Sequence, residues 1–226
     1  KFSYYDGSDQ DSLARGFSDG SYSQARLFPA SSNFASVEAK YKDNIYNTQP
    51  GAGVAVFGFN IDRQAYNHTS KTSDEQKSST KKAILNKNFR QAITFALNRE
   101  NYSAQVNGKE YAKAAIRNMY TAPAFVQVNG KDFGDVVADK LQTYGDQWSG
   151  VNLADSQDGL YNKDKAKAQF EKAKAELQKE GVQFPIHLDV PVVQSSTNFV
   201  ARMQSFKQSV EDTLGKENVV VDLQMM

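Results

Sequence analysis

Cysteine is absent from this sequence of 226 residues, which has only two histidines and one tryptophan. Without cysteine the chain forms no disulfide, no thiolate metal site and no cysteine nucleophile. That absence suits an exported protein, because an unpaired thiol outside the cell invites oxidation. No apolar run approaches the roughly 20 residues of a membrane-spanning helix. Acidic and basic residues nearly cancel to a net charge of +1. The sequence therefore lacks the basic surplus that is typical of nucleic-acid-binding proteins.

Motifs for catalysis and metal binding are also missing. His68 lies in a polar stretch and His187 alternates with apolar residues, and neither has a second ligand at metal-binding spacing. The sequence has no Gly-x-Ser-x-Gly elbow and no Gly-Lys-Ser/Thr phosphate loop. Paired carboxylates of glycosidases depend on separation in space, which spacing along the chain does not give. We therefore expect no catalytic residue, no metal and no cofactor.

The N-terminal third mixes short elements with polar connections. Residues 2–5 and 23–28 predict strands. Helices are expected over 11–17, capped by Asp11 or Ser12, and from Ser32 to Tyr41, where apolar residues recur three and four apart.

The segment that follows divides into a strand and a loop. Residues 53–61 alternate in the pattern of a strand with two different faces. Residues 62–82 are rich in Ser, Thr and Lys, which predicts an exposed loop.

The clearest helix of the middle section begins after Asn86. Its apolar stripe has helical spacing and consists of Phe89, Ile93, Ala96 and Leu97. Asn98 is expected to cap a second helix that ends near Val106. Residues 107–161 lack periodicity and predict an unusually long loop, a feature that often serves a function.

The C-terminal section predicts a helix followed by a βαβ unit. Asn162 caps the helix, which ends at Gly181. Residues 186–192 and 219–226 predict strands, and the helix between them begins at Ser196 or Thr197 and ends at Gly215. Strands joined in this way are parallel, and their crossover is right-handed.

Three segments resemble the family-5 solute-binding proteins of ABC importers. Residues 57–60, Phe-Gly-Phe-Asn, resemble an aromatic strand of that family. Residues 86–100 resemble its pattern of a cap, Val-Arg-Gln-Ala, a hydrophobic residue and then Ala-hydrophobic-Asp-Arg. Residues 164–185 resemble its Ala-Lys-x-Leu-Leu-x-x-Ala-Gly helix and the strand after it, although Phe170 and the 179–181 end depart from that wording. The middle segment is the specific one.

The resemblance implies a fold and a division of the chain. The implied fold class is α/β (mixed α+β), a periplasmic-binding-protein-like type II clamshell represented mainly by one lobe, with a mixed sheet flanked by helices. Residues 1–50 would be the tail end of the first lobe and the crossover. Residues 51–226 would be the second, C-terminal lobe, truncated before its last segments, so that this piece alone binds peptides weakly.

The resemblance also implies a transport function. Two lobes would close over an extended oligopeptide, hold its main chain by strand-like hydrogen bonds, and deliver it to ABC permease subunits. The full-length protein would be a monomer, lipid-anchored at the extracellular face of a Gram-positive cell membrane, with no enzyme activity and no nucleic-acid partner. Open alternatives are a receptor for one signalling peptide, a binder of a sugar or nickel complex, and a surface adhesin or interaction domain on the same fold.

Candidate peptide contacts fall in three places. An aromatic set, Phe57, Phe59 and Asn60, would lie near the crossing between lobes. Residues 194–202, at a strand end and a helix N-terminus, match a family stretch near the peptide carboxyl end, where free N–H groups suit a carboxylate. The candidates there are Gln194, Asn198, Phe199 and Arg202. Trp148 either lines the cleft or anchors its own loop.

Overall fold

The computed structural model describes residues 9–46 and 53–226. Its first part contains helices α1 (Gln10–Ser18) and α2 (Phe34–Tyr41), which touch through Phe17 and Tyr41 with ring centroids 5.0 Å apart. Asp9 caps α1 by accepting a hydrogen bond from the Asp11 N–H, so the predicted caps Asp11 and Ser12 are wrong by two or three residues.

The N-terminal part of the structure differs from two further predictions. The strand expected at 23–28 is wrong, since the described residues offer it no partner strand and Phe28 is instead buried beneath the Arg26 guanidinium. Ser32 does not cap α2, because its hydroxyl donates to Asp11. The strand expected at 2–5 falls outside the described residues.

Helix α3 (Asp74–Leu85) occupies much of the segment expected to be an exposed loop. Ser73 caps α3 by accepting from the Gln76 N–H, and acidic residues in the first turn favour its start. Its buried face consists of Ser79, Thr80 and Ala83. Small polar residues on the inner face hide the helical period, which explains the wrong prediction.

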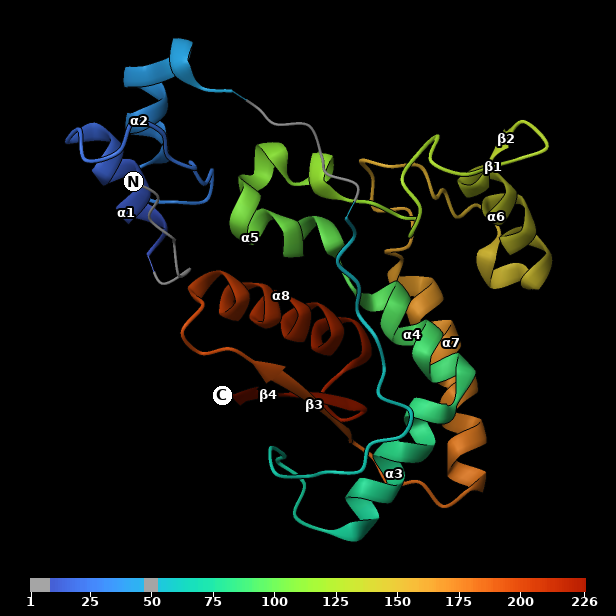
Figure 1. Ribbon diagram of the computed structural model, residues 1–226. Helices are drawn as coiled ribbons and strands as arrows, with labels where there is room; N and C mark the ends of the chain where they lie inside the picture. Colours follow the sequence, from blue (N-terminus) through green and yellow to red (C-terminus); the bar gives the residue numbers. More distant parts are fainter. Residues whose placement is uncertain (1–8, 47–52) are drawn as a thin grey trace.

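Helices α4 (Lys87–Ala96) and α7 (Lys163–Lys179) lie side by side (Figure 1), and both contribute residues to the hydrophobic core. Asn86 and Asn162 cap them as predicted, each accepting a backbone N–H three residues ahead. The rings of Phe89 and Phe170 meet between them, with centroids 6.3 Å apart. The apolar stripes of α4 and α7 therefore pack on each other.

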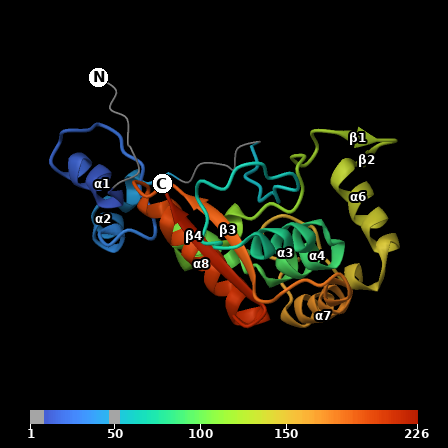
Figure 2. The same ribbon diagram turned by 90° about the horizontal axis from the view of Figure 1, so that it is seen from below.

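Helix α5 (Arg99–Tyr111) begins at the predicted cap, Asn98, and extends past Val106, with a break at Gly108, where φ is 67°. The section expected to be a long loop holds a small hairpin, β1 (Gln127–Val128) and β2 (Lys131–Asp132), and helix α6 (Phe133–Leu141). Figure 2 shows this unit at one end of the molecule and α1 with α2 at the other.

The predicted βαβ unit is confirmed. Strands β3 (Ile186–Val192) and β4 (Val219–Met225) pair in parallel, and α8 (Thr197–Leu214), capped by Ser196, joins them and packs against the pair (Figure 1). The expected mixed sheet is wrong for the described residues, whose sheets are the antiparallel β1–β2 and the parallel β3–β4 pairs. Within the described ranges, no helix is both long and apolar enough to span a membrane.

Candidate functional site

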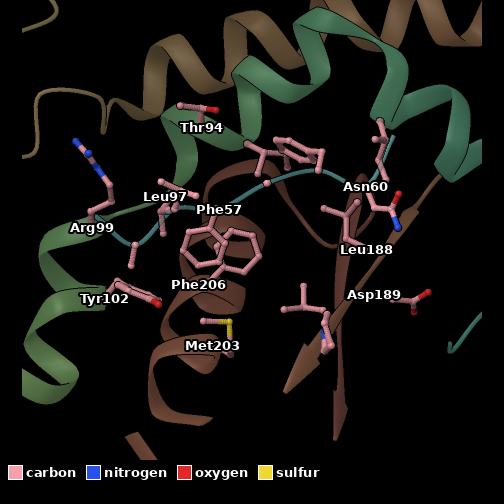
Figure 3. Close-up of a pocket in the computed structure, with 18 of the residues that line it drawn as sticks. Phe57, Asn60, Thr94, Leu97, Arg99, Tyr102, Leu188, Asp189, Met203 and Phe206 are labelled. Atoms are coloured by element: carbon pink, nitrogen blue, oxygen red, sulfur yellow. The ribbon is translucent and has the colours of Figure 1, made fainter. Parts of the chain in front are cut away.

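A cavity of about 740 Å³ lies between the extended segment 54–61, helices α4, α5 and α8, and strand β3 (Figure 3). Its walls are mainly apolar. Its lining comes from several elements and includes Phe57, Ile93, Leu97, Tyr102, Leu188, Phe199, Met203 and Phe206. A concave apolar site with a few polar groups is the usual form of a ligand pocket.

Aromatic rings form one wall of the cavity. Phe57 stacks on Phe206 with centroids 5.1 Å apart and planes inclined by 20°, and it meets the edge of Tyr102 at 5.4 Å. The helical spacing within α8 turns Phe206 inward, and α5 presents Tyr102, whose pKa is raised by burial. Phe57 itself remains 47% exposed, so this wall retains surface that a ligand can cover.

The segment predicted as a strand, residues 53–61, is extended but belongs to no sheet. Among the described residues, no backbone–backbone hydrogen bond joins it to another segment. Alternating side chains are compatible with a strand, but a strand also requires a neighbouring edge. The prediction is therefore wrong about pairing, and the segment leaves backbone groups unpaired beside the cavity.

Strand β3 turns one edge toward the same cavity, which Leu188, Asp189, Val190 and Pro191 line. The Ile186 N–H and the Val192 carbonyl bond to the β4 side, and main-chain groups alternate in direction along a parallel strand. The main-chain groups of Asp189 and Pro191 therefore point away from β4. Such an edge can accept a further extended segment.

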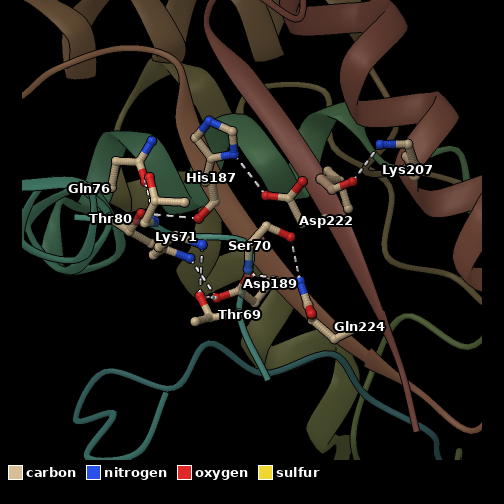
Figure 4. Close-up of polar contacts among 12 residues, drawn as sticks. Thr69, Ser70, Lys71, Gln76, Thr80, His187, Asp189, Lys207, Asp222 and Gln224 are labelled. Carbon is tan, nitrogen blue, oxygen red and sulfur yellow. Dashed lines mark hydrogen bonds and ion pairs between the residues drawn. The ribbon is translucent and has the colours of Figure 1, made fainter. Parts of the chain in front are cut away.

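Asp189 is the centre of a polar cluster at the rim (Figure 4). Its carboxylate accepts hydrogen bonds from Lys71 Nζ at 2.6 Å, Thr69 Oγ1 at 2.7 Å and Arg63 Nη1 at 2.5 Å. Burial opposes ionisation of this group, but these hydrogen bonds outweigh it and lower the Asp189 pKa to about 2. The carboxylate is therefore ionised and binds residues 63–71 to β3.

Lys71 is the most buried cation of this cluster, with a side chain that has no exposed surface. Burial lowers its pKa, and the adjacent Asp189 charge acts in the opposite direction. The prediction of an exposed loop is thus also wrong for Lys71. The ion pair accounts for its position, because a buried charge requires a partner.

A second polar pair lies on the strands themselves. His187 Nδ1 is 2.8 Å from Asp222 Oδ2 across the β3–β4 register (Figure 4). The described part of the chain contains no group of His, Cys, Asp and Glu residues that could hold a metal ion. The His187–Asp222 pair joins β3 to β4.

The structure brings half of the predicted contact residues to the cavity. Its lining includes Phe57, Phe59, Asn60 and Phe199. Trp148 packs on Phe95, with centroids 5.2 Å apart, and so anchors its own loop to the core. Gln194 is exposed, and its N–H donates to the Met226 carbonyl.

Asn198 and Arg202 lie one turn apart on α8, and neither lines the cavity. The Arg202 guanidinium is 5.4 Å from the centroid of the Tyr102 ring. Asn198 Oδ1 and Arg202 Nε are both buried and have no hydrogen-bond partner among the described residues. Buried polar atoms without partners are uncommon and call for an explanation.

Sequence reasoning missed several lining residues. Met203 and Phe206 belong to an apolar stripe on α8, which is typical of core, and Tyr102 lies in a helix without a strong apolar stripe. Only the meeting of α5, α8 and segment 54–61 makes these residues a wall. The sequence did indicate the aromatic residues Phe57 and Phe59 of this wall region.

Comparison with known proteins gives consistent results. Residues 1–226 match the family described as bacterial extracellular solute-binding proteins, family 5 Middle. The chain is 64% identical over 223 residues to the oligopeptide-binding protein AmiA of Streptococcus pneumoniae, 58% identical to AliA of the same species, and 57% identical to SarA of Streptococcus gordonii. These matches cover 99% or 100% of the chain but 34% of each relative, so it spans about a third of their length.

A solved structure shares the fold. The substrate-binding domain of an oligopeptide ABC transporter from Bacillus anthracis matches 97% of this chain and 34% of its own, with a TM-score of 0.54 at 15% identity. That identity supports fold alone, whereas the family match extends over every residue. The chain belongs to the family-5 bacterial extracellular solute-binding proteins.

Proposed function

We propose that this chain is part of the substrate-binding component of an ABC importer, which captures extended oligopeptides and delivers them to a membrane permease. The observation that carries the proposal is the 64% identity, over 99% of the chain, to a protein named for oligopeptide binding. The cavity supports it, because unpaired backbone and an aromatic wall face the same space.

The main chain of a peptide would bind along the β3 edge. Asp189 offers an N–H and a carbonyl there, and Pro191 offers only a carbonyl. Hydrogen bonds to the main chain give affinity whatever the peptide sequence is. Side chains that alternate along the peptide would then meet Phe57 on one side and solvent on the other.

The carboxyl end of the peptide would bind near the start of α8. Arg202 Nε is a buried donor without a partner in the described chain, and the dipole of α8 at its N-terminus favours a carboxylate there. Asn198 would orient the guanidinium or receive a peptide N–H. Phe199, which lines the cavity from the same turn, would contact the last side chain.

The complete protein would be a clamshell of two lobes. Residues 1–50 would be the tail end of the first lobe and the crossover, and residues 51–226 would form most of the second lobe. Ligand binding would shift the hinge between the lobes toward the closed state. It would act as a monomer outside the cell, held at the membrane by a lipid anchor beyond these residues, and would interact with permease subunits. No catalytic step or cofactor is part of this function.

The test uses the full-length protein that contains this chain. Peptides retained through purification are released by acid and identified by mass spectrometry, and affinities are measured by calorimetry. Several peptides of different sequence support general uptake, whereas one retained peptide favours a signalling receptor. An adhesin is favoured if no peptide binds but extracellular matrix does, and that result overturns the proposal.

A further inference from the structure

Cations outnumber carboxylates around the cavity. Four of its lining side chains carry a positive charge and one carries a negative charge: Arg63, Lys81, Arg99, Arg117 and Asp189. The surface between them is apolar and aromatic. Figure 3 shows Arg99 at one end and Asp189 at the other, with the Phe57–Phe206 stack between them.

The one carboxylate is already neutralised. Asp189 pairs with Lys71 at 2.6 Å and with Arg63 at 2.5 Å, and its side chain is only 4% exposed. In Figure 3 its carboxylate points away from the aromatic stack. A lysine or arginine of a ligand would therefore find no free carboxylate among the described lining residues.

The cations are less completely satisfied. Arg99 is held by Asp158 at 2.7 Å, but Arg117 is 3.7 Å from Asp155, and its Nη1 is buried with no hydrogen-bond partner in the described chain. Lys81 is exposed and forms no ion pair within the described ranges. Lys81 thus provides exposed positive charge that a ligand can meet, and Arg117 adds a cation in the cavity lining whose pairing is incomplete.

We infer that this cavity selects its ligand by charge: it accepts a large apolar side chain next to an acidic or uncharged residue, and it disfavours lysine and arginine. A cation entering it would lose hydration near like charges and gain no partner, whereas a carboxylate would gain one. The apolar side chain would cover the exposed surface of Phe57. The inference rests on the proposed function, since it names the class of peptide that this site takes.

The experiment compares three hexapeptides, Ala-Ala-Phe-X-Ala-Ala, in which X is Glu, Gln or Lys. Affinities for the full-length protein are measured by calorimetry at low and moderate salt. We expect the Glu peptide to bind at least about tenfold more tightly than the Lys peptide, with the Gln peptide between them. Added salt should reduce the ratio, because Lys81 is exposed to screening.

Two variants and one control test the source of the selection. Lys81→Met and Arg117→Gln should each lower the Glu-to-Lys affinity ratio by about threefold or more, while the Gln peptide reports any general loss. Lys172→Met, an exposed lysine on α7 outside the cavity, should leave the ratio unchanged. Equal binding of the three peptides, or a ratio that both cavity variants preserve, overturns the inference and leaves peptide capture intact. If none of these peptides and no library peptide binds, the proposed function itself fails.

Discussion

Lys71 Nζ lies 2.6 Å from Asp189 Oδ2, and the two side chains are 0% and 4% exposed. A buried ion pair of this kind adds modest net stability, but removing one partner leaves the other charge buried and alone. Asp189 also accepts hydrogen bonds from Thr69 and Arg63. The cluster therefore determines whether residues 63–71 stay on β3.

Replacing Asp189 with Asn should destabilise the protein by about 3 kcal/mol, since Lys71 would lose its counter-charge. Equilibrium urea unfolding measures the change. Asp139→Asn is the matched control: its carboxylate pairs with Lys131 on the surface and is 71% exposed, so its loss should cost about 0.5 kcal/mol or less. If the two substitutions changed the free energy of unfolding equally, the buried cluster would contribute no more stability than a surface ion pair.

Acid should weaken the same cluster. The Asp189 pKa is about 2 in the folded chain, below its usual 3.8, so the folded state binds this proton less readily than the unfolded state. The stabilisation is fully present above about pH 4 and is lost as pH falls toward 2, a loss of about 2 kcal/mol. Unfolding free energies measured between pH 5 and pH 2 should fall less steeply in Asp189→Asn than in the wild type; parallel curves would contradict the assignment.

Phe57→Ala should affect binding more than stability. The ring covers Phe206 and Tyr102, but it lies on a segment without backbone pairing and is 47% exposed. We expect peptide affinity to fall about tenfold and the unfolding free energy to change by less than about 1 kcal/mol. Tyr144→Ala, which removes an aromatic ring that is 58% exposed and outside the cavity, should leave affinity unchanged. An unaltered affinity in Phe57→Ala would remove this wall from the binding site.

Phe89→Ala tests the pairing of α4 with α7. The ring has no exposed surface and packs on Phe170, so its removal opens a cavity and should cost about 3–5 kcal/mol. Leu85→Ala, at the exposed end of α3 with 52% of its surface accessible, should cost less than about 1 kcal/mol. Both are measured by urea unfolding, and a small effect at Phe89 would place the core elsewhere.

The candidate site was only partly accessible to sequence reasoning. An aromatic pattern drew attention to Phe57 and Phe59, and both line the cavity. Trp148 was ambiguous because a single aromatic in a long unpatterned stretch packs equally well in a cleft or on its own loop; here it packs on Phe95. Tyr102 carries no signal along the chain, because its role depends on where α5 meets segment 54–61.

Local chemistry in the sequence determined the starts of α4, α5, α7 and α8. Asn86, Asn98, Asn162 and Ser196 each accept a backbone N–H three residues ahead, and capping involves only neighbours in sequence. The parallel pairing of β3 and β4 was also predictable from the sequence, because a helix between two strands usually brings the chain back to run parallel to the first strand.

Tertiary structure alone decided what residues 53–85 do. Alternation at 53–61 does not supply an edge to pair with, and the small polar face of α3 becomes an inner face only because Ser79 accepts the Gln183 N–H and Thr80 donates to the His187 carbonyl. The burial of Lys71 likewise requires Asp189, 118 residues later. Such contacts join distant segments, so no local pattern contains them.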